Sequence, residues 1–356
     1  MTSKERASSL KRKLSFVAPG TPLREGIDHV LKANTGGLIV VGYNDTMKGL
    51  MDGGFRMDYA FTPSALYELS KMDGAIVLTD DGGRILYANT QLSPAPSIGT
   101  SETGMRHRTA ERVAIETGKL VIAISQRRQV ITLYQGVEKY VLRDIGIILT
   151  KANQAMQTLE KYKVVLEQAM TNLSALEFEG MVTYADVLLM LHRIEMLMQI
   201  KNEMTEYVME LGEEGRLVRL QLKELLSVIE KEVIAFIQDY CNAHDTEAQH
   251  IMDRLQEGKR TQLMMEQALA KLMHFPAVPD RSKVITPRGY RILLKVPRLP
   301  AASARAIARR FQDLNQIIQM PKEKFTQVEG IGEVRAKNII KGLERLREQV
   351  MLDRSL

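Results

Sequence analysis

The chain has 356 residues, of which 45% are apolar and 26% are charged. This mixture is ordinary for globular proteins, and the length leaves room for about two or three domains. The single cysteine, Cys241, excludes an internal disulfide and fits a reducing compartment. No stretch approaches the roughly 20 apolar residues of a membrane span, and the basic N-terminal segment has no apolar run behind it. We therefore expect a cytoplasmic protein with no signal peptide and no membrane partner.

The net charge of +6 is unevenly distributed along the chain. Residues 286–356 hold 15 Lys and Arg against 7 Asp and Glu, whereas the rest of the chain holds 34 against 36. All of the excess positive charge therefore lies in the last fifth of the chain. A basic module on a nearly neutral body is typical of proteins with a polyanionic partner, although a solvated basic surface would give the same balance.

The first 140 residues alternate strand-like and helical patterns. We predict helices over residues 23–33, 63–71 and 109–117, and strands over residues 38–42, 75–79, 84–88, 120–125 and 130–134. A turn separates the second and third of these strands, and a basic turn separates the last two. This order favours an α/β domain over residues 1–140, with a mixed sheet flanked by helices.

The middle of the chain, residues 141–287, has a helical pattern nearly throughout. No proline occurs between residues 97 and 275, and apolar residues recur at intervals of three and four positions. We expect three or four long helices that form an all-α bundle or spine. Residues 275–287 contain three prolines and form a linker to the C-terminal region.

The C-terminal region, residues 288–356, is predicted to be all-α and contains a glycine turn. Gly330-Ile331-Gly332 lies between two helical stretches, within residues 325–340. Glycines let backbone N–H groups approach an anion, and the following helix start adds unpaired donors and a positive dipole end. Arg335 and Lys337 add charge in the first turns of that helix. These features suit the binding of DNA phosphates without readout of bases.

The same segment resembles the helix-hairpin-helix family of DNA-binding motifs. Residues 296–307 could be a degenerate first copy, but they lack the glycines and should bind phosphate poorly. A helix–helix turn that serves only protein contacts remains an alternative for the glycine turn.

Two short motifs in the first domain carry candidate chemistry. Asp73-Gly74-Ala75 comes directly before a predicted strand, and Arg106-His107-Arg108 opens a predicted helix. A carboxylate at a strand start can hold Mg²⁺ or Mn²⁺, and a cationic cluster can neutralise phosphate. Together they suit phosphoryl transfer, where catalysis is mostly positioning and stabilisation of charge. Each motif alone is weak, since the first is usually a turn and the second usually lies on the surface.

The two motifs are followed along the chain by a helical spine and then by a helix-hairpin-helix module. This order resembles the members of the diadenylate cyclase family that carry a C-terminal DNA-binding domain. The resemblance covers essentially the whole chain. It implies condensation of two ATP into cyclic di-AMP and two pyrophosphates, by two cyclase domains that face each other. It also implies site roles. Asp73 would hold the metal and help to deprotonate the 3′-hydroxyl, and the other contacts to ATP would come from Gly74, Leu92, Arg106, His107, Arg108, Thr109, Ser125 and Arg128.

The resemblance further implies partners and an assembly. The partner of the hairpin module would be branched DNA, such as a Holliday junction, whose binding lowers the synthesis of cyclic di-AMP. The protein would form an octamer and lie near the nucleoid. Recombination proteins are further candidate partners. Many relatives have threonine where this chain has Met105, so we assign no adenine contact to the side chain of Met105.

Two functions of other kinds remain open at this stage. The chain could be a structural DNA-binding protein with a degenerate nucleotide-binding domain, or a nucleotidyltransferase that acts on nucleic acid ends. The presence of Asp73 together with Arg106, His107 and Arg108 argues against a degenerate domain.

Overall fold

The computed structural model describes Leu14 and residues 16–241, 247–257, 264–276 and 280–355. Most of the basic N-terminal segment and part of the expected linker lie outside these residues. The chain divides into two compact units, Met1–Ala152 with Glu206–Val218, and Asn153–Thr205 with Arg219–Leu356. None of the helices in the described part of the chain combines the length and apolarity that a membrane crossing needs.

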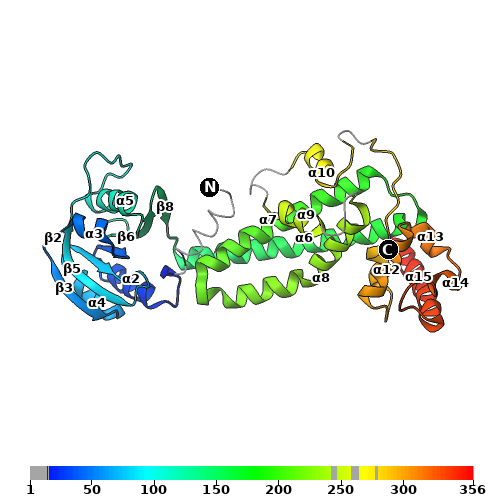
Figure 1. Ribbon diagram of the computed structural model, residues 1–356, viewed down its shortest axis with the longest axis horizontal. Coiled ribbons are helices and arrows are strands. Elements are labelled where there is room, and N and C mark those ends of the chain that lie inside the picture. The colour runs from blue at the N-terminus through cyan, green and yellow to red at the C-terminus, as the bar shows by residue number, and fades with distance from the viewer. Residues whose placement is uncertain (1–13, 15, 242–246, 258–263, 277–279, 356) are drawn as a thin grey trace. The chain divides into compact units, whose positions relative to one another are not determined.

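The first unit is built on a mixed sheet (Figure 1). The strand order is β2-β5-β4-β1-β6-β7-β8, and β3 also pairs with β5. The β1–β4 pair is parallel, and the other pairs are antiparallel. The strands are β1 Gly37–Val41, β2 Met51–Asp52, β3 Phe55–Ala60, β4 Ala75–Leu78, β5 Arg84–Leu92, β6 Leu120–Ser125, β7 Val130–Gln135 and β8 Glu138–Val141. The predicted mixed sheet is confirmed, whereas the strands β2, β3 and β8 were not predicted from the sequence.

Helices cover both faces of this sheet because its central strands are apolar on both sides. Along β1, Ile39 and Val41 belong to one core cluster, whereas Leu38 and Val40 belong to another. This alternation follows from the two-residue period of a strand. The first cluster includes side chains of α2 Pro22–Lys32 and α4 Pro63–Leu69, and the second those of α3 Asp45–Leu50 and α5 Met105–Thr117.

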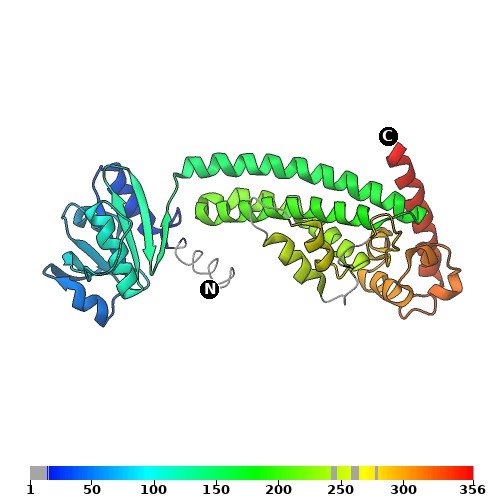
Figure 2. The same ribbon diagram turned by 90° about the horizontal axis from the view of Figure 1, so that it is seen from above.

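Three long helices and two short ones follow the sheet. They are α6 Ile145–Glu179, α7 Tyr184–Leu211, α8 Arg216–Tyr240, α9 Ala248–Gln256 and α10 Glu266–Leu272. Figure 2 shows α6 and α7 side by side, and most of both helices belongs to the second unit. The long helices expected from the proline-free stretch are therefore present.

The C-terminal module packs on the helices of the second unit. Its elements are α11 Tyr290–Lys295, α12 Ala301–Phe311, α13 Leu314–Ile318, α14 Lys322–Phe325 and α15 Glu333–Ser355. Their core also includes Phe178 of α6 and Ala235 of α8. The module therefore shares one hydrophobic core with the long helices and is not joined to them by the linker alone.

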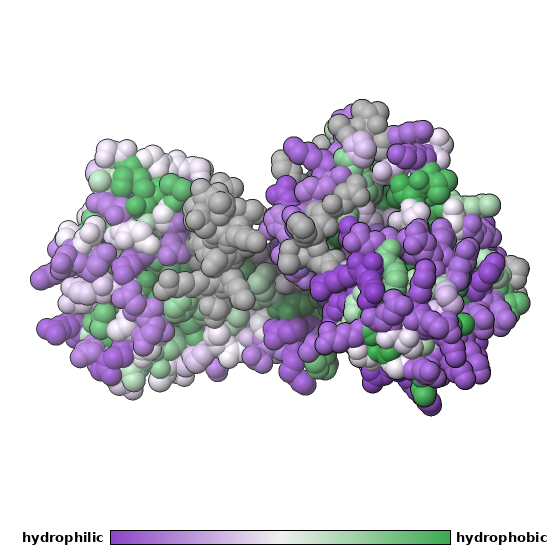
Figure 3. All heavy atoms as spheres, turned by 45° about the vertical axis from the view of Figure 1, so that its right-hand side comes forward, coloured by the Kyte–Doolittle hydropathy of each residue, from purple (hydrophilic) through white to green (hydrophobic). Residues whose placement is uncertain are grey.

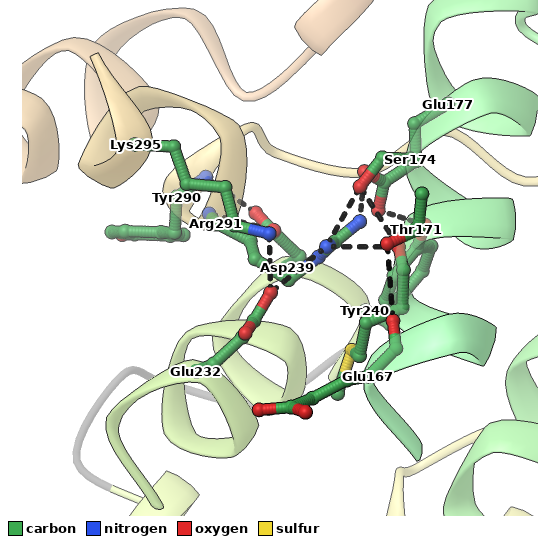
Figure 4. A network of polar contacts seen from close by, with 11 residues as sticks. Glu167, Thr171, Ser174, Glu177, Glu232, Asp239, Tyr240, Tyr290, Arg291 and Lys295 are labelled. Carbon is green, nitrogen blue, oxygen red and sulfur yellow. Dashed lines mark hydrogen bonds and ion pairs between the residues drawn. The ribbon is translucent and has the colours of Figure 1, made fainter. Parts of the chain in front are cut away.

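A buried network of charges fixes α11 against α6 and α8 (Figure 4). The guanidinium of Arg291, 1% exposed, pairs with Glu177 and donates to Ser174 Oγ at 2.9 Å. Asp239 accepts from the backbone N–H groups of Tyr290 and Arg291 at 2.5 Å and 3.0 Å. Burial raises the pKa of Asp239 to about 7, and the charge of Glu177 adds to this effect. Removal of one partner from such a network typically costs about 3–5 kcal/mol.

Candidate functional site

A cavity of about 1050 Å³ opens in the first unit, at the N-terminus of α5. We call it the α5 cavity. It lies at one edge of the sheet, where β1 and β4 begin and where β5 and β6 end. It brings together eight of the nine residues predicted for the cyclase site, namely Asp73, Gly74, Leu92, Arg106, His107, Thr109, Ser125 and Arg128. Residues far apart in the sequence thus converge on one hollow, while their individual roles stay predictions.

Arg108 is the predicted residue that does not line the α5 cavity, and its side chain is exposed. The reason is the start of the helix. We expected Arg106-His107-Arg108 to open a helix with its regular part from residue 109, and α5 begins at Met105. Successive helical residues are rotated by about 100°, so Arg106 and Arg108 lie on nearly opposite faces. Its predicted contact with the nucleotide therefore finds no support in the cavity of this chain.

The start of α5 supplies backbone donors as well as side chains. Gly104 is its N-cap and, as a glycine, offers no side-chain cap to the free N–H groups of the first turn. Gly104, Met105, Arg106 and His107 all line the cavity. Unpaired N–H groups and the positive end of the helix dipole attract anions such as phosphate. The side chain of Met105 is 83% exposed.

Gly74 is held by the neighbouring strand. A Cβ atom at this position would lie 2.3 Å from the carbonyl carbon of Asn89, so no larger residue fits. The N–H of Gly74 donates to Asn89 Oδ1 at 3.2 Å, and Asn89 itself has a positive φ of 52°. The glycine therefore serves the packing of β4 against β5, in addition to the open approach that the sequence suggested. This contact fixes the backbone next to Asp73, which lies exposed at the cavity.

Gly36 makes room for the guanidinium of Arg106. A Cβ atom at Gly36 would lie 2.1 Å from Arg106 Nη1 and 2.8 Å from its Cζ. Gly36 lies directly before β1, about seventy positions from Arg106 in the sequence. Nothing in the sequence indicated this contact, because it depends on the pairing of strands across the sheet.

A chain of polar contacts lies behind His107. Its Nδ1 is 3.0 Å from the hydroxyl oxygen of Tyr134, and that hydroxyl donates to Glu102 Oε1 at 2.7 Å. Lys139 forms an ion pair with Glu102. Burial lowers the pKa of His107, and the charges of Lys139, Arg106 and Arg128 act in the same direction, against Glu102. Glu102 was not among the predicted residues, although it lines the cavity.

The other side of the cavity is formed by the turn after β6 and by the end of β5. Ser125 Oγ accepts from the backbone N–H of Arg128 at 3.2 Å, which orders the basic turn. Leu92, at the end of β5, is 8% exposed. Thr90 also lines the cavity, and its buried Oγ1 has no hydrogen-bond partner among the described residues.

The donor set fits a divalent metal that is held largely by substrate. Among the described residues, no group of three or more His, Cys, Asp or Glu side chains could hold a metal ion. The cavity does offer the carboxylates of Asp73 and Asp52. Mg²⁺ in nucleotide sites is usually bound by about one or two carboxylates together with phosphates and water. A cage made only of protein is therefore not required here.

The glycine turn of the second unit forms the predicted hairpin between α14 and α15, which we call the glycine hairpin. Gly330 has a φ of +79°, and a Cβ atom at Gly330 or Gly332 would meet nothing within 4 Å. Arg335 Nη1 donates to the carbonyl oxygen of Gly330 at 2.5 Å. The backbone of this turn is thus open to approach by a ligand. Lys337, on the next turn of α15, is exposed.

The segment before α12 has the same backbone geometry, and we call it the upstream hairpin. Leu299 N donates to Val296 O, as Ile331 N donates to Val328 O in the glycine hairpin. Arg298, with a φ of +64°, stands where the glycine hairpin has Gly330. Pro300, which has no N–H, stands where the glycine hairpin has Gly332. The upstream hairpin keeps the shape but not the open backbone donors.

Hydrophilic side chains dominate the surface of the second unit that is turned forward in Figure 3. The exposed basic residues of its C-terminal module are spread over both hairpins and the helices that follow them. They include Arg298, Arg305, Arg309, Arg310, Lys324, Arg335, Lys337 and Lys341. This distribution accounts for the local excess of positive charge and suits a polyanion.

Comparison with known proteins gives consistent matches along the chain. Residues 24–139 match the family model of the nucleotide-binding region of the DisA bacterial checkpoint controller, and residues 142–281 match its linker region. The DNA integrity scanning protein DisA of Bacillus pumilus is 55% identical over 343 residues, which are 96% of this chain and 96% of that protein. The protein of the same name from Bacillus subtilis is 55% identical and covers 96% of this chain and 95% of its own length.

Among solved structures, a double mutant of DacA from Staphylococcus aureus is 20% identical. The match has a TM-score of 0.29 and covers 39% of this chain and 90% of that chain.

Proposed function

Because the chain belongs to the family of the DNA integrity scanning protein DisA, we propose that it condenses two ATP molecules into cyclic di-AMP in the α5 cavity. The family supports a diadenylate cyclase with a role in DNA integrity scanning. The observation that carries the finer proposal is the convergence of Asp73, Arg106, His107 and Arg128 with the open N-terminus of α5 around one cavity. A carboxylate and groups suited to binding phosphate thus line the same cavity, which supports the proposal.

The reaction divides into two equivalent steps. In each, the 3′-oxygen of one ATP forms a bond to the α-phosphorus of the other, and the bond from that phosphorus to the bridging oxygen breaks. Pyrophosphate leaves with the electron pair, and the proton of the 3′-hydroxyl passes to a base, for which Asp73 is the candidate at the cavity. Arg106, Arg128 and the first N–H groups of α5 stabilise the negative charge on the phosphates.

Asp73 would hold Mg²⁺ or Mn²⁺ together with the phosphates of ATP. When bound, such a metal lowers the pKa of an oxygen nucleophile and stabilises departing pyrophosphate. Gly74 would keep the Asp73 backbone in place through its contact with Asn89. Thr109, Ser125 and the side chain of Leu92 would line the nucleotide.

The symmetry of the product requires two ATP sites that face each other. One α5 cavity holds half of such a centre, so a second copy of the chain must supply the other half. We propose that the assembly is an octamer, as the family resemblance implies, and that it acts in the cytoplasm near the nucleoid.

The glycine hairpin would bind branched DNA through phosphates, and junction DNA would lower the synthesis of cyclic di-AMP. The open backbone at Gly330 and Gly332, with Arg335 and Lys337 on the following helix, supports this part of the proposal. Recombination proteins are a further candidate class of partner.

The test is incubation of the purified full chain with ATP and either Mg²⁺ or Mn²⁺, followed by chromatography of the products. We expect cyclic di-AMP together with two pyrophosphates for each molecule formed. Absence of cyclic di-AMP from a preparation whose oligomeric state has been measured would contradict the proposal. Transfer of labelled nucleotide to added DNA ends, without the cyclic product, would instead favour a nucleotidyltransferase that acts on nucleic acid.

A further inference from the structure

We infer that Lys139, Glu102 and Tyr134 form a positioning chain that holds His107 in a single tautomer, with the proton on Nδ1 and the lone pair on Nε2. The effect of this chain on the reaction rate rests on the proposed cyclase function. The tautomer itself does not, and it can be measured without turnover.

The residues of this positioning chain come from three separate segments of the first unit. Glu102 lies in the loop before α5, Tyr134 lies on β7 and Lys139 lies on β8. The Tyr134 side chain is buried, with the whole residue 1% exposed, and the Glu102 side chain is 11% exposed. The distances are 2.7 Å from Tyr134 Oη to Glu102 Oε1 and 3.0 Å from Tyr134 Oη to His107 Nδ1. The rings of His107 and Tyr134 also meet edge to face, with centroids 6.2 Å apart.

The direction of each hydrogen bond follows from the charge at the far end. Burial acts against ionisation of Glu102, but the hydrogen bonds from Lys139 and Tyr134 hold its pKa below the usual value. An ionised carboxylate can only accept, so the single hydroxyl proton of Tyr134 must point to Glu102. The pKa of Tyr134 is raised above its usual value, first by burial and then by Glu102, so that proton stays in place.

The Tyr134 oxygen can then only accept from His107. Nδ1 must therefore carry a proton, and a neutral imidazole has its lone pair on the other nitrogen, Nε2. Among the described residues, Nε2 of His107 has no hydrogen-bond partner, and His107 lines the α5 cavity. Nε2 would thus act as an acceptor for a hydroxyl group of the bound nucleotide. The opposite tautomer would present a donor and could not take this role.

The surroundings of His107 favour its neutral form. Burial lowers its pKa, as do Lys139 from β8, Arg106 from its own helix and Arg128 from the turn after β6, whereas Glu102 raises it. The positioning chain therefore fixes both the orientation of the His107 ring and the ring nitrogen that remains unprotonated. Glu102, Tyr134 and Lys139 are positioning residues, since they act through His107.

The direct test is solid-state NMR of the full-length protein labelled with ¹⁵N at histidine, with His107→Gln used to assign the signals. We expect a neutral His107 with a protonated Nδ1 in the wild type. Tyr134→Phe should give a mixture of tautomers, and Glu102→Gln, whose neutral amide can accept from or donate to Tyr134, should weaken the preference for the Nδ1 form. Tyr59→Phe is the matched control, because Tyr59 is 54% exposed on β3 and does not line the cavity.

The kinetic test uses the same variants. Tyr134→Phe should lower kcat by about 10- to 100-fold, the usual effect of losing a group that orients a functional histidine, with little change in the KM for ATP. Without the tyrosine hydroxyl, the unshielded charge of Glu102 should raise the pKa of His107. The acidic limb of the kcat profile should therefore move to higher pH.

A wild-type His107 with the proton on Nε2, or a Tyr134→Phe variant with unchanged tautomer and unchanged pH profile, would overturn the inference. The cyclase proposal would survive that result if cyclic di-AMP is formed. Conversely, a wild type that forms no cyclic di-AMP but shows the Nδ1 tautomer would refute the cyclase proposal and leave the positioning chain intact.

Discussion

The α5 cavity and the glycine hairpin present ligand-binding groups in different ways. The cavity collects side chains from segments between Leu38 and Arg128, and each is held by contacts with other segments. The hairpin offers the backbone of one short turn, with a positive φ at Gly330 and open space around it. The cavity should therefore be sensitive to side chains and to the neighbours that place them. The hairpin should be sensitive to backbone conformation.

The largest effect should come from the carboxylate of the cavity. Asp73→Asn keeps the size of the side chain but removes the charge available to a metal and to the hydroxyl proton. We expect cyclic di-AMP synthesis to fall by about 10²- to 10³-fold, the range for loss of one preorganised electrostatic group. Affinity for branched DNA should stay the same, because Asp73 lies in the first unit and the hairpin in the second. Nearly full synthesis of cyclic di-AMP by this variant would contradict the assignment of Asp73 to the site.

The next effect tests whether neighbours place the side chains of the cavity. Gly36→Ala should displace the guanidinium of Arg106, because the added Cβ would overlap with it. A misplacement of about 1 Å can cost about 100-fold in rate, and we expect a loss approaching that value in initial-rate measurements. Stability should fall as well, but less, since the added Cβ would also lie 3.1 Å from the backbone carbonyl oxygen of Ile124. Gly99→Ala is the matched control, because a Cβ there meets nothing within 4 Å. Equal rates for the two variants would contradict the contact.

A smaller effect should come from the backbone of the glycine hairpin. Gly330→Ala adds no clash but places a side chain at a φ of +79°, which costs about 1–2 kcal/mol. If the turn rearranges to avoid this cost, affinity for a four-way junction should fall by about tenfold, with a shallower dependence on salt. Gly136→Ala is the control, since its φ is +54° and it also has no neighbour within 4 Å, but it lies between β7 and β8. An equal loss of DNA affinity in the control would mean that lower stability of the protein, and not the backbone of the glycine hairpin, causes the effect.

The smallest effect should come from the upstream hairpin, where a non-glycine residue has the same backbone conformation. Arg298→Gly should relieve the strain at its φ of +64° and raise the free energy of unfolding by about 1 kcal/mol or less. Gln312→Gly, with a φ of +54° at the end of α12, should give a similar gain outside the hairpin. Chemical denaturation measures both. Destabilisation by Arg298→Gly would mean that the arginine side chain itself supports the turn.

The comparison also explains how much could be predicted from the sequence. The glycine hairpin lies within one continuous segment, so the positions of its glycines and basic residues could be read directly. The chemistry of the α5 cavity was indicated by two weak motifs, around Asp73 and Arg106, and its other residues could be named only through family resemblance. The neighbours of these residues could not be named at all. Glu102 and Tyr134 are 32 positions apart in the chain and meet through the packing of α5 and its preceding loop against β7. Such contacts depend on the arrangement of the sheet, which local patterns do not encode.

Arg108 is the one predicted site residue that does not line the α5 cavity, and the reason is local. Arg108 was assigned to the site together with Arg106 and His107 through the family motif, and the three were expected to open a helix. Gly104 acts as N-cap and starts α5 at Met105, so the helical rotation turns Arg108 away from the cavity. The missing side-chain cap left no sequence signal for this start.

The most direct measurement is the rate of cyclic di-AMP formation by the full chain from ATP and a divalent metal, with and without a four-way DNA junction. We expect synthesis without DNA, a lower rate with the junction, and a weaker response to the junction in Gly330→Ala. No cyclic di-AMP in either condition would refute the role of the α5 cavity. Equal rates with and without bound junction would refute the link between the cavity and the glycine hairpin.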